Sequence, residues 1–155
     1  MTKHEEIAGE LFLSGAGCCQ AVFCAFCDVH GLGRVQAARL ASSMGGGVGR
    51  MREVCGAVSG AAMVMGLVYG FDYPPTGTEK ADLYAAVQEM ISPFRAEFGS
   101  VVCRDLLASA GCAVSGAPTP EARTAEFYAR RPCLRAVRLA ARCLDEYLAA
   151  HPIEK

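Results

Sequence analysis

The sequence predicts an all-α protein, a compact helical bundle of about five main helices with short helices between them. Two observations support this fold class. Apolar residues recur at the spacing of an amphipathic helix in five segments, and no segment shows the alternating pattern of a half-buried strand. The chain has 155 residues, 52% of them hydrophobic. Because this length suits one core, we expect residues 1–155 to form a single domain.

The expected helices follow one another between breaks rich in glycine or proline. The apolar stripes lie within residues 8–12, 21–26, 37–44, 83–94 and 137–148. The breaks that separate them are residues 15–17, 31–33, 45–49, 73–77 and 109–120. Pro93 lies inside the fourth stripe and cannot donate a helical hydrogen bond, so we expect a kink or break at residues 91–94.

A further apolar segment, residues 54–71, contains no charged residue and two GxxxG spacings. Its length of eighteen residues reaches the lower limit for a membrane-spanning helix. It is the only segment of its kind, and the other helices are amphipathic. We therefore expect no membrane partner but a helix buried within the bundle or packed against a second copy of the chain, which leaves a homodimer open.

Charge and the first residues exclude further classes. A formal net charge of −1 gives no general attraction for nucleic acid, so we expect no nucleic-acid partner. The first thirteen residues lack the basic and long apolar regions of an export signal, which predicts a cytoplasmic protein. No histidine pattern typical of metalloproteases or catalytic triads is present, and whether the protein is an enzyme stays open.

A glycine-rich loop at residues 45–50 precedes the apolar segment. It lacks the Lys and Ser/Thr of a phosphate-binding P-loop and the GxGxxG of a dinucleotide site, and no strand precedes it, so nucleotide binding is not expected. Residues without a Cβ let the backbone approach another group closely. We take five residues of this loop as candidate cofactor-binding residues: Gly45, Gly46, Gly47, Gly49 and Arg50.

The chain contains nine cysteines, an unusually high and odd number. In a reducing compartment, many cysteines indicate metal binding or redox chemistry rather than disulfides, although about half of these nine are expected to be buried apolar residues. Cys24 and Cys27 form a CxxC motif that we expect in the middle of a helix. There the two thiols share a face and can pair or bind metal, but packing is the favoured interpretation.

Four cysteines are expected in the first turn of a helix. Cys18 and Cys55 follow glycine-rich segments, Cys103 would be the third helical residue if Ser100 is the N-cap, and Cys133 follows Pro132, a favoured first helical residue. Free N–H groups and the helix dipole favour anions at this position. We therefore expect a lowered thiol pKa, which suits metal ligation or attack on a disulfide.

These residues bring the chain close to a known family. The segments around Cys18, Cys55, Cys103 and Cys133 resemble the redox-active proteins named for a C_GCAxxG_C_C cysteine pattern, a mostly bacterial or archaeal family. The most specific match is the CGAxxG sequence at residues 55–60. The resemblance implies that these four are the family's cysteines and that iron–sulfur binding is the expected chemistry. Cys19 and Cys112 match variable positions, whereas Cys24, Cys27 and Cys143 are peculiar to this chain.

Three functions therefore remain open. The first is an iron–sulfur protein, with a [2Fe–2S] cluster held by Cys18, Cys55, Cys103 and Cys133, amide donors from the glycine loop and Arg50 or Arg52 offsetting the cluster's charge. Its role would be electron transfer or sensing with an unidentified redox partner protein. The second is a metal-free thiol–disulfide protein. The third is a structural zinc site, which is disfavoured because the ligands lack close CxxC pairs.

Overall fold

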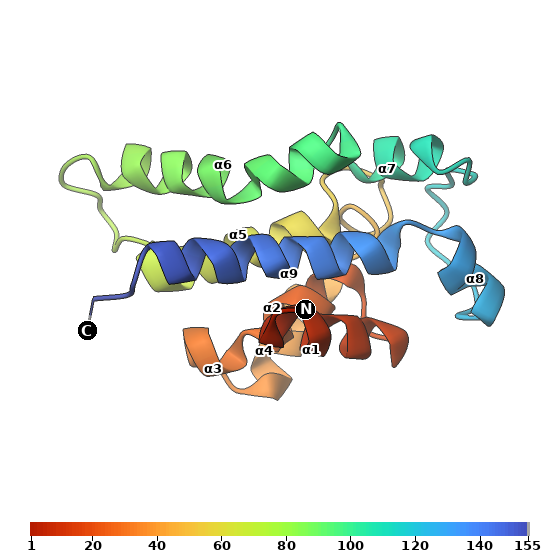
Figure 1. Ribbon diagram of the computed structural model, residues 1–155, viewed down its shortest axis with the longest axis horizontal. Helices are drawn as coiled ribbons and strands as arrows, with labels where there is room; N and C mark the ends of the chain where they lie inside the picture. The colour runs from red at the N-terminus through yellow and green to blue at the C-terminus, as the bar shows by residue number, and fades with distance from the viewer. Residues whose placement is uncertain (155) are drawn as a thin grey trace.

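The computed structural model describes residues 1–154 and confirms the all-α fold class (Figure 1). This part of the chain contains no β-strand, only an isolated antiparallel bridge between Val54 and Val102. The helices, in chain order, are α1 (Lys3–Leu13), α2 (Cys18–Ala25), α3 (Cys27–His30), α4 (Arg34–Ala41), the 3₁₀ helix η1 (Ser42–Met44), α5 (Gly56–Tyr69), α6 (Glu79–Phe98), α7 (Cys103–Ser109), α8 (Ala125–Arg130) and α9 (Cys133–Ala150).

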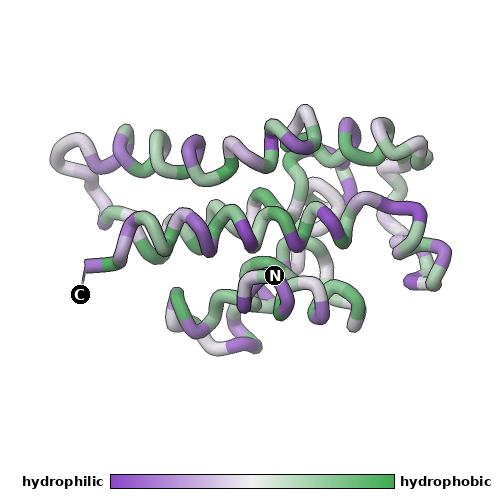
Figure 2. Tube along the Cα trace, in the orientation of Figure 1, coloured by the Kyte–Doolittle hydropathy of each residue, from purple (hydrophilic) through white to green (hydrophobic). Residues whose placement is uncertain are grey.

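The long helices form layers around α5 and α9, which contact each other in the middle of the structure (Figure 1). On one side α6 packs against both of them. On the other side α1 packs on α9, and α2 packs on α5, α1 and α9. Figure 2 shows hydrophilic and hydrophobic residues alternating along α9, as expected of a helix with one face in the core and one in solvent.

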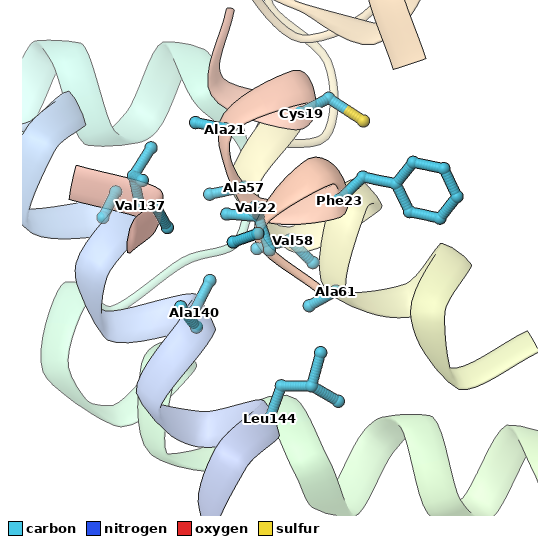
Figure 3. Close-up of a cluster of buried hydrophobic side chains, with 14 of the residues drawn as sticks. Cys19, Ala21, Val22, Phe23, Ala57, Val58, Ala61, Val137, Ala140 and Leu144 are labelled. Carbon is cyan, nitrogen blue, oxygen red and sulfur yellow. The ribbon is translucent and has the colours of Figure 1, made fainter. Parts of the chain in front are cut away.

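The core lies where α2, α5 and α9 meet. Figure 3 shows the side chains of Val22 from α2, Ala57 from α5 and Ala140 from α9 gathered there, and none of the three has solvent-exposed surface. The side chains of α5 are mostly small, so the helices around it can approach closely. This packing holds the first turns of α2, α5 and α9 at one end of the bundle.

Two glycines of α5 set the distance between α5 and α2. A Cβ added at Gly56 would lie 3.0 Å from the backbone nitrogen of Cys19, and one added at Gly60 would lie 2.9 Å from the carbonyl oxygen of Cys19. Such short contacts with backbone atoms cannot be relieved by a side-chain rotation. The first GxxxG spacing is therefore a helix-packing motif within the bundle, and it brings the start of α2 against the start of α5.

Two local expectations differ from the structure. The break expected at Pro93 does not occur, since α6 continues through it. Pro93 and Glu89 both lie on the exposed side of α6, where water can bind the Glu89 carbonyl that loses its helical partner. The CxxC motif does not lie in the middle of a helix either, because the backbone at Phe26 leaves helical geometry (φ −101°, ψ 19°) and separates Cys24, at the end of α2, from Cys27, at the start of α3.

Within residues 1–154, none of the helices combines the length and apolar character that crossing a membrane requires. The α5 helix, which contains most of the uncharged segment, has only 14 residues.

A buried histidine connects three helices away from the cysteines. His4 of α1 is flanked by two carboxylates, with Nδ1 2.6 Å from Asp145 of α9 and Nε2 2.9 Å from Asp28 of α3, and its ring stacks on Phe26. Burial by itself lowers the pKa of His4, but the hydrogen bonds to Asp145 and Asp28 outweigh it and raise the pKa above 6.5. The same contacts outweigh burial at the two carboxyl groups and lower the pKa of each.

The close approach of α2 and α5 predicts opposite effects of alanine at two glycines of one helix. Gly60→Ala should destabilise the protein by about 1–3 kcal/mol, because the new Cβ overlaps the α2 backbone. Gly66→Ala meets nothing within 4 Å and should stabilise the protein by up to about 1 kcal/mol, because alanine is the better helix former. Urea unfolding of both variants measures the difference, and equal effects would rule out the packing role of Gly60.

The His4 contacts predict a pH dependence of stability. A raised pKa means that the folded state binds the proton more tightly, so this stabilisation is complete below pH 6.5 and is lost as the pH rises through the folded-state pKa. His4→Gln should lose about 1.5–3 kcal/mol of unfolding free energy at pH 6 and less at higher pH. Urea unfolding at several pH values tests this, with the exposed His151→Gln as control. A loss that does not change with pH would show that His4 stabilises the fold by packing alone.

Candidate functional site

The four cysteines expected at helix starts line one cavity of about 310 Å³, although 115 residues separate the first from the last. Each lies where a helix begins: Cys18, Cys103 and Cys133 are the first residues of α2, α7 and α9, and Cys55 is the N-cap of α5. Cys55 and Cys103 are buried, whereas Cys18 and Cys133 are partly exposed. Four helix starts thus meet at the end of the bundle.

Two helix starts assigned from the sequence are wrong by one or two residues. The N-cap of α7 is Val102, not Ser100, because the bridge to Val54 holds Val102 in an extended conformation and the Ser100 hydroxyl accepts a hydrogen bond from the Val102 N–H. Pro132 is the N-cap of α9 and not its first residue. Both corrections place the cysteine at the first helical position, so the expected first-turn location is confirmed.

A short backbone pairing fixes Cys55 relative to Cys103. The Cys55 N–H donates to the Val101 carbonyl at 2.8 Å, and the Cys103 N–H donates to the Glu53 carbonyl at 2.6 Å. These bonds flank the bridge between Val54 and Val102. Because main-chain groups make the contact, the distance between the two helix starts does not depend on side-chain packing. This pairing was not predicted, since isolated bridges leave no alternating pattern in a sequence.

The glycine loop that precedes Cys55 follows an uncommon backbone path. Six residues between positions 46 and 52 have positive φ: Gly46, Gly47, Val48, Gly49, Arg50 and Arg52. Positive φ strains residues that carry a Cβ, and most strongly a β-branched valine. Hydrogen bonds across the loop hold this path, among them Arg52 N–H to the Gly46 carbonyl at 3.1 Å and Glu53 N–H to the Gly47 carbonyl at 2.9 Å. A Cβ at Gly47 would lie 2.5 Å from the Glu53 nitrogen, so this position requires glycine.

All five loop residues that the sequence offered as cofactor-binding candidates line the same cavity as the four cysteines: Gly45, Gly46, Gly47, Gly49 and Arg50. Arg52, the other arginine of the loop, lines it too. The loop and the thiols therefore belong to one site, and the binding role of the loop residues stays a prediction.

The cavity is strongly basic. Four arginines and one carboxylate line it, so with neutral thiols the lining carries an excess of three positive charges. Arg52 Nη1 lies 3.6 Å from the Cys103 sulfur, in hydrogen-bond range for sulfur. Arg131 pairs with Glu121 and lies over the Phe127 ring, and Arg123 lies over the Phe12 ring at 4.5 Å. Sequence reasoning missed Arg123 and Arg131; only the proximity of Arg131 to Cys133 in the sequence could have indicated it.

The segment between α7 and α8, residues 110–124, forms one wall of the cavity through Pro118, Pro120, Glu121 and Arg123. The arginines of the glycine loop hold this segment through its backbone. Arg52 Nε donates to the Ser115 carbonyl at 2.9 Å, and Arg50 Nη1 donates to the carbonyls of Ala117 and Thr119. Arg123 of this segment also donates to the carbonyls of Phe12 and Ala16, so polar contacts attach the wall at both ends.

The thiols of Cys18 and Cys133 interact, and each shifts the pKa of the other. The contact with the Cys18 thiol lowers the pKa of Cys133 to about 7, and the positive charge of Arg131 acts in the same direction against burial. The interaction with Cys133, together with burial, raises the pKa of Cys18 well above its usual value. At pH 7 about half of Cys133 is therefore thiolate, stabilised by the Cys18 thiol.

The other two thiols stay protonated, contrary to the general lowering expected at helix starts. Burial raises the pKa of Cys55 to about 12, although the amides of Ala57 and Val58 favour its thiolate. Burial also raises the pKa of Cys103, although Arg52 opposes it. Desolvation thus outweighs the helix terminus at both positions. A lowered pKa at the helix start is found only at Cys133.

Within residues 1–154, no three His, Cys, Asp or Glu side chains lie close enough together to hold a metal ion. Each of the nine cysteines is a free thiol.

The remaining five cysteines lie outside the cavity lining. Cys19 is fully buried with its sulfur 3.7 Å from that of Met63, and Cys143 is buried in α9. Cys24 and Cys27 contact each other across the start of α3, where burial raises the pKa of Cys24. Cys112 is half-buried in the α7–α8 segment, with its thiol 3.5 Å from the Arg130 carbonyl.

Comparison with known proteins identifies the family. The chain belongs to the family described as "Putative redox-active protein (C_GCAxxG_C_C)", which matches residues 16–147 and so includes the four cavity cysteines. The family name gives a Gly-Cys-Ala-x-x-Gly run, whereas this chain has Cys55-Gly56-Ala57 in that region. Neither the curated proteins nor the solved structures give a match. The resemblance inferred from the sequence is thereby confirmed.

The thiol pair predicts that Cys133 is the most reactive cysteine of the reduced, metal-free protein. At pH 7 about half of it is thiolate, and its alkylation rate should rise as the pH passes through about 7. Cys18→Ala removes the stabilising thiol and should slow alkylation at pH 7 by about tenfold if the pKa returns to its usual value. Peptide mass spectrometry after brief iodoacetamide treatment measures the rates. Cys143→Ala, on the same helix, should leave the Cys133 rate unchanged; faster labelling of Cys55 than of Cys133 would contradict the assignment.

Proposed function

We propose that this protein is a redox protein in which Cys18, Cys55, Cys103 and Cys133 bind an iron–sulfur cluster, preferably [2Fe–2S], for electron transfer or sensing. The observation that supports it is the convergence of these four thiols, from four separate helix starts, on one cavity. Four cysteine thiolates are the usual ligand set of such clusters. When bound, the cluster would supply one-electron redox chemistry.

The residues around the thiols suit a negatively charged group of this kind. Thiolate ligands and inorganic sulfide give the cluster a net negative charge, and an excess of arginines lines the cavity. Burial of Cys55 and Cys103 keeps water from two of the four ligands. The high pKa values of the metal-free thiols are no obstacle, because metal binding displaces the thiol proton.

Zinc fits the same residues less well. A single tetrahedral ion requires four sulfurs about 2.3 Å from one point. No group of three metal-ligating side chains within residues 1–154 is so arranged, whereas the cavity has room for a centre with more than one metal atom. The size of the cavity is what supports a cluster over a structural zinc ion.

A second candidate function is metal-free thiol–disulfide exchange, and the Cys18–Cys133 pair favours it. The Cys133 thiolate would attack a disulfide of a partner protein or small molecule and release one thiol. The Cys18 sulfur, on losing its proton, would then attack Cys133 in the mixed disulfide and release the second. The two protein thiols would lose two electrons to the partner disulfide, which is reduced to two thiols. A reducing cytoplasm would return the pair to free thiols.

Anaerobic purification followed by a visible absorption spectrum and assays of iron, acid-labile sulfide and zinc tests the cluster proposal. We expect a coloured protein with two iron and two sulfide per chain for a [2Fe–2S] cluster. Cys55→Ser should lose at least about tenfold in bound iron, because a ligand at the centre of the site is missing. Cys143→Ser, buried but outside the cavity, should retain the full complement.

Three outcomes separate the candidates. A colourless protein that takes up no iron after reconstitution would reject the cluster. Stoichiometric zinc without iron would support the structural zinc site. Oxidation to a disulfide between Cys18 and Cys133 without metal, reversed by a thiol reductant and lost in Cys18→Ser, would support the exchange function.

A further inference from the structure

Three of the arginines that line the cavity lie close to one another. Arg52 and Arg131 are almost fully buried, with 6% and 9% of their surface exposed. Burial lowers the pKa of Arg50, and the positive charges of Arg52 and Arg131 lower it further. The only carboxylate in the lining, Glu121, pairs with Arg131. Two of the three charges thus have no anionic partner in the cavity, and the one on Arg52 is almost fully buried, where an unpaired charge is costly.

The hydrogen bonds of these arginines leave donors unused. A guanidinium group has five N–H donors. The bonds that Arg50 and Arg52 make go to neutral carbonyl oxygens of residues 115–119 and to the Cys103 sulfur, which balance no charge. Arg131 Nε is buried and has no hydrogen-bond partner among the described residues. A buried donor without a partner costs about 1–3 kcal/mol, which indicates that an acceptor is missing.

Backbone amides of the glycine loop add further donors. Gly46 and Gly47 line the cavity, and their N–H groups donate no hydrogen bond to any residue between 1 and 154. Both have positive φ. Successive amides of a turn can form a concave anion-binding surface, as in phosphate sites. The cavity thus combines free amides with three guanidinium groups, as sites for small anions do.

We propose that this end of the cavity binds a small tetrahedral oxyanion of the phosphate or sulfate type, held by Arg50, Arg52, Arg131 and the amides of Gly46 and Gly47. The negative charge balances the two unpaired guanidinium charges, and the oxygens accept from the unused N–H groups. The cavity of about 310 Å³ holds such an ion with room to spare. The proposal uses guanidinium and amide donors only, so it does not depend on a cluster at the thiols.

The position of the site gives the oxyanion a relation to the redox chemistry. Arg52 contacts the Cys103 sulfur, and Arg131 is near Cys133, so the ion would lie beside two of the four thiols. The two occupants share one set of positive charges. A cluster at the thiols therefore weakens oxyanion binding, and an oxyanion disfavours the more negative state of the cluster.

Isothermal titration calorimetry with inorganic phosphate and with sulfate tests the proposal, at constant ionic strength set by sodium chloride. Metal-free and reconstituted protein are compared. We expect saturable binding of one ion by the metal-free protein and weaker binding by any cluster-loaded protein. Arg131→Gln should bind at least tenfold more weakly. Arg52→Lys keeps the charge but not the fork of donors and should also bind more weakly.

The matched control is Arg39→Met, which removes an exposed arginine of α4 outside the cavity and should leave binding unchanged. Far-UV circular dichroism of each variant shows whether it is folded, and if Arg52→Lys is not, Arg131→Gln decides. Heat changes that do not saturate or that chloride reproduces would overturn the proposal, as would an equal loss in Arg39→Met. If the protein takes up no cluster, the metal-free titration still gives the answer.

Discussion

The close contact between α2 and α5 is the constraint on which the site depends. Gly56 and Gly60 let the two backbones meet without an intervening side chain, and the helix starts carrying Cys18 and Cys55 are neighbours as a result. With α2 in place, α9 packs against it and brings Cys133 to Cys18. The backbone pairing of residues 53–55 with residues 101–103 adds Cys103. The glycine pair and this backbone pairing together bring four distant thiols to one end of the bundle.

Much of this arrangement was predictable from the sequence, and the rest was not for physical reasons. The helical periodicity and the glycine or proline before each cysteine are local signals, and they located the helices and the four thiols at their first turns. Whether Pro93 breaks a helix depends on the solvent exposure of one carbonyl, which a sequence does not show. Arg123 and Arg131 reach the cavity only because residues 110–124 fold across it, and that path is fixed by contacts with Arg50 and Arg52.

Electrostatics and burial oppose each other throughout the cavity. Removal from water keeps Cys55 protonated, while the arginines favour thiolates and other anions. The cavity contains unpaired positive charge and a buried donor without a partner, Arg131 Nε. Buried groups of this kind are typical of functional sites. The strained loop at residues 46–52 is of the same kind, because Val48 adopts a backbone conformation that costs energy. These unfavourable contributions to stability all lie at the cavity, where binding of an anion would offset them.

The order of the four cysteines along the chain has a consequence for biosynthesis. Cys133 comes from the last helix, so an emerging polypeptide that stops short of α9 presents at most three of the thiols. A metal bound at that stage would lack its fourth ligand, and the Cys18 thiol would lack its neighbour, the Cys133 thiol. Assembly of the proposed cluster would therefore follow the packing of α9 onto α1 and α2.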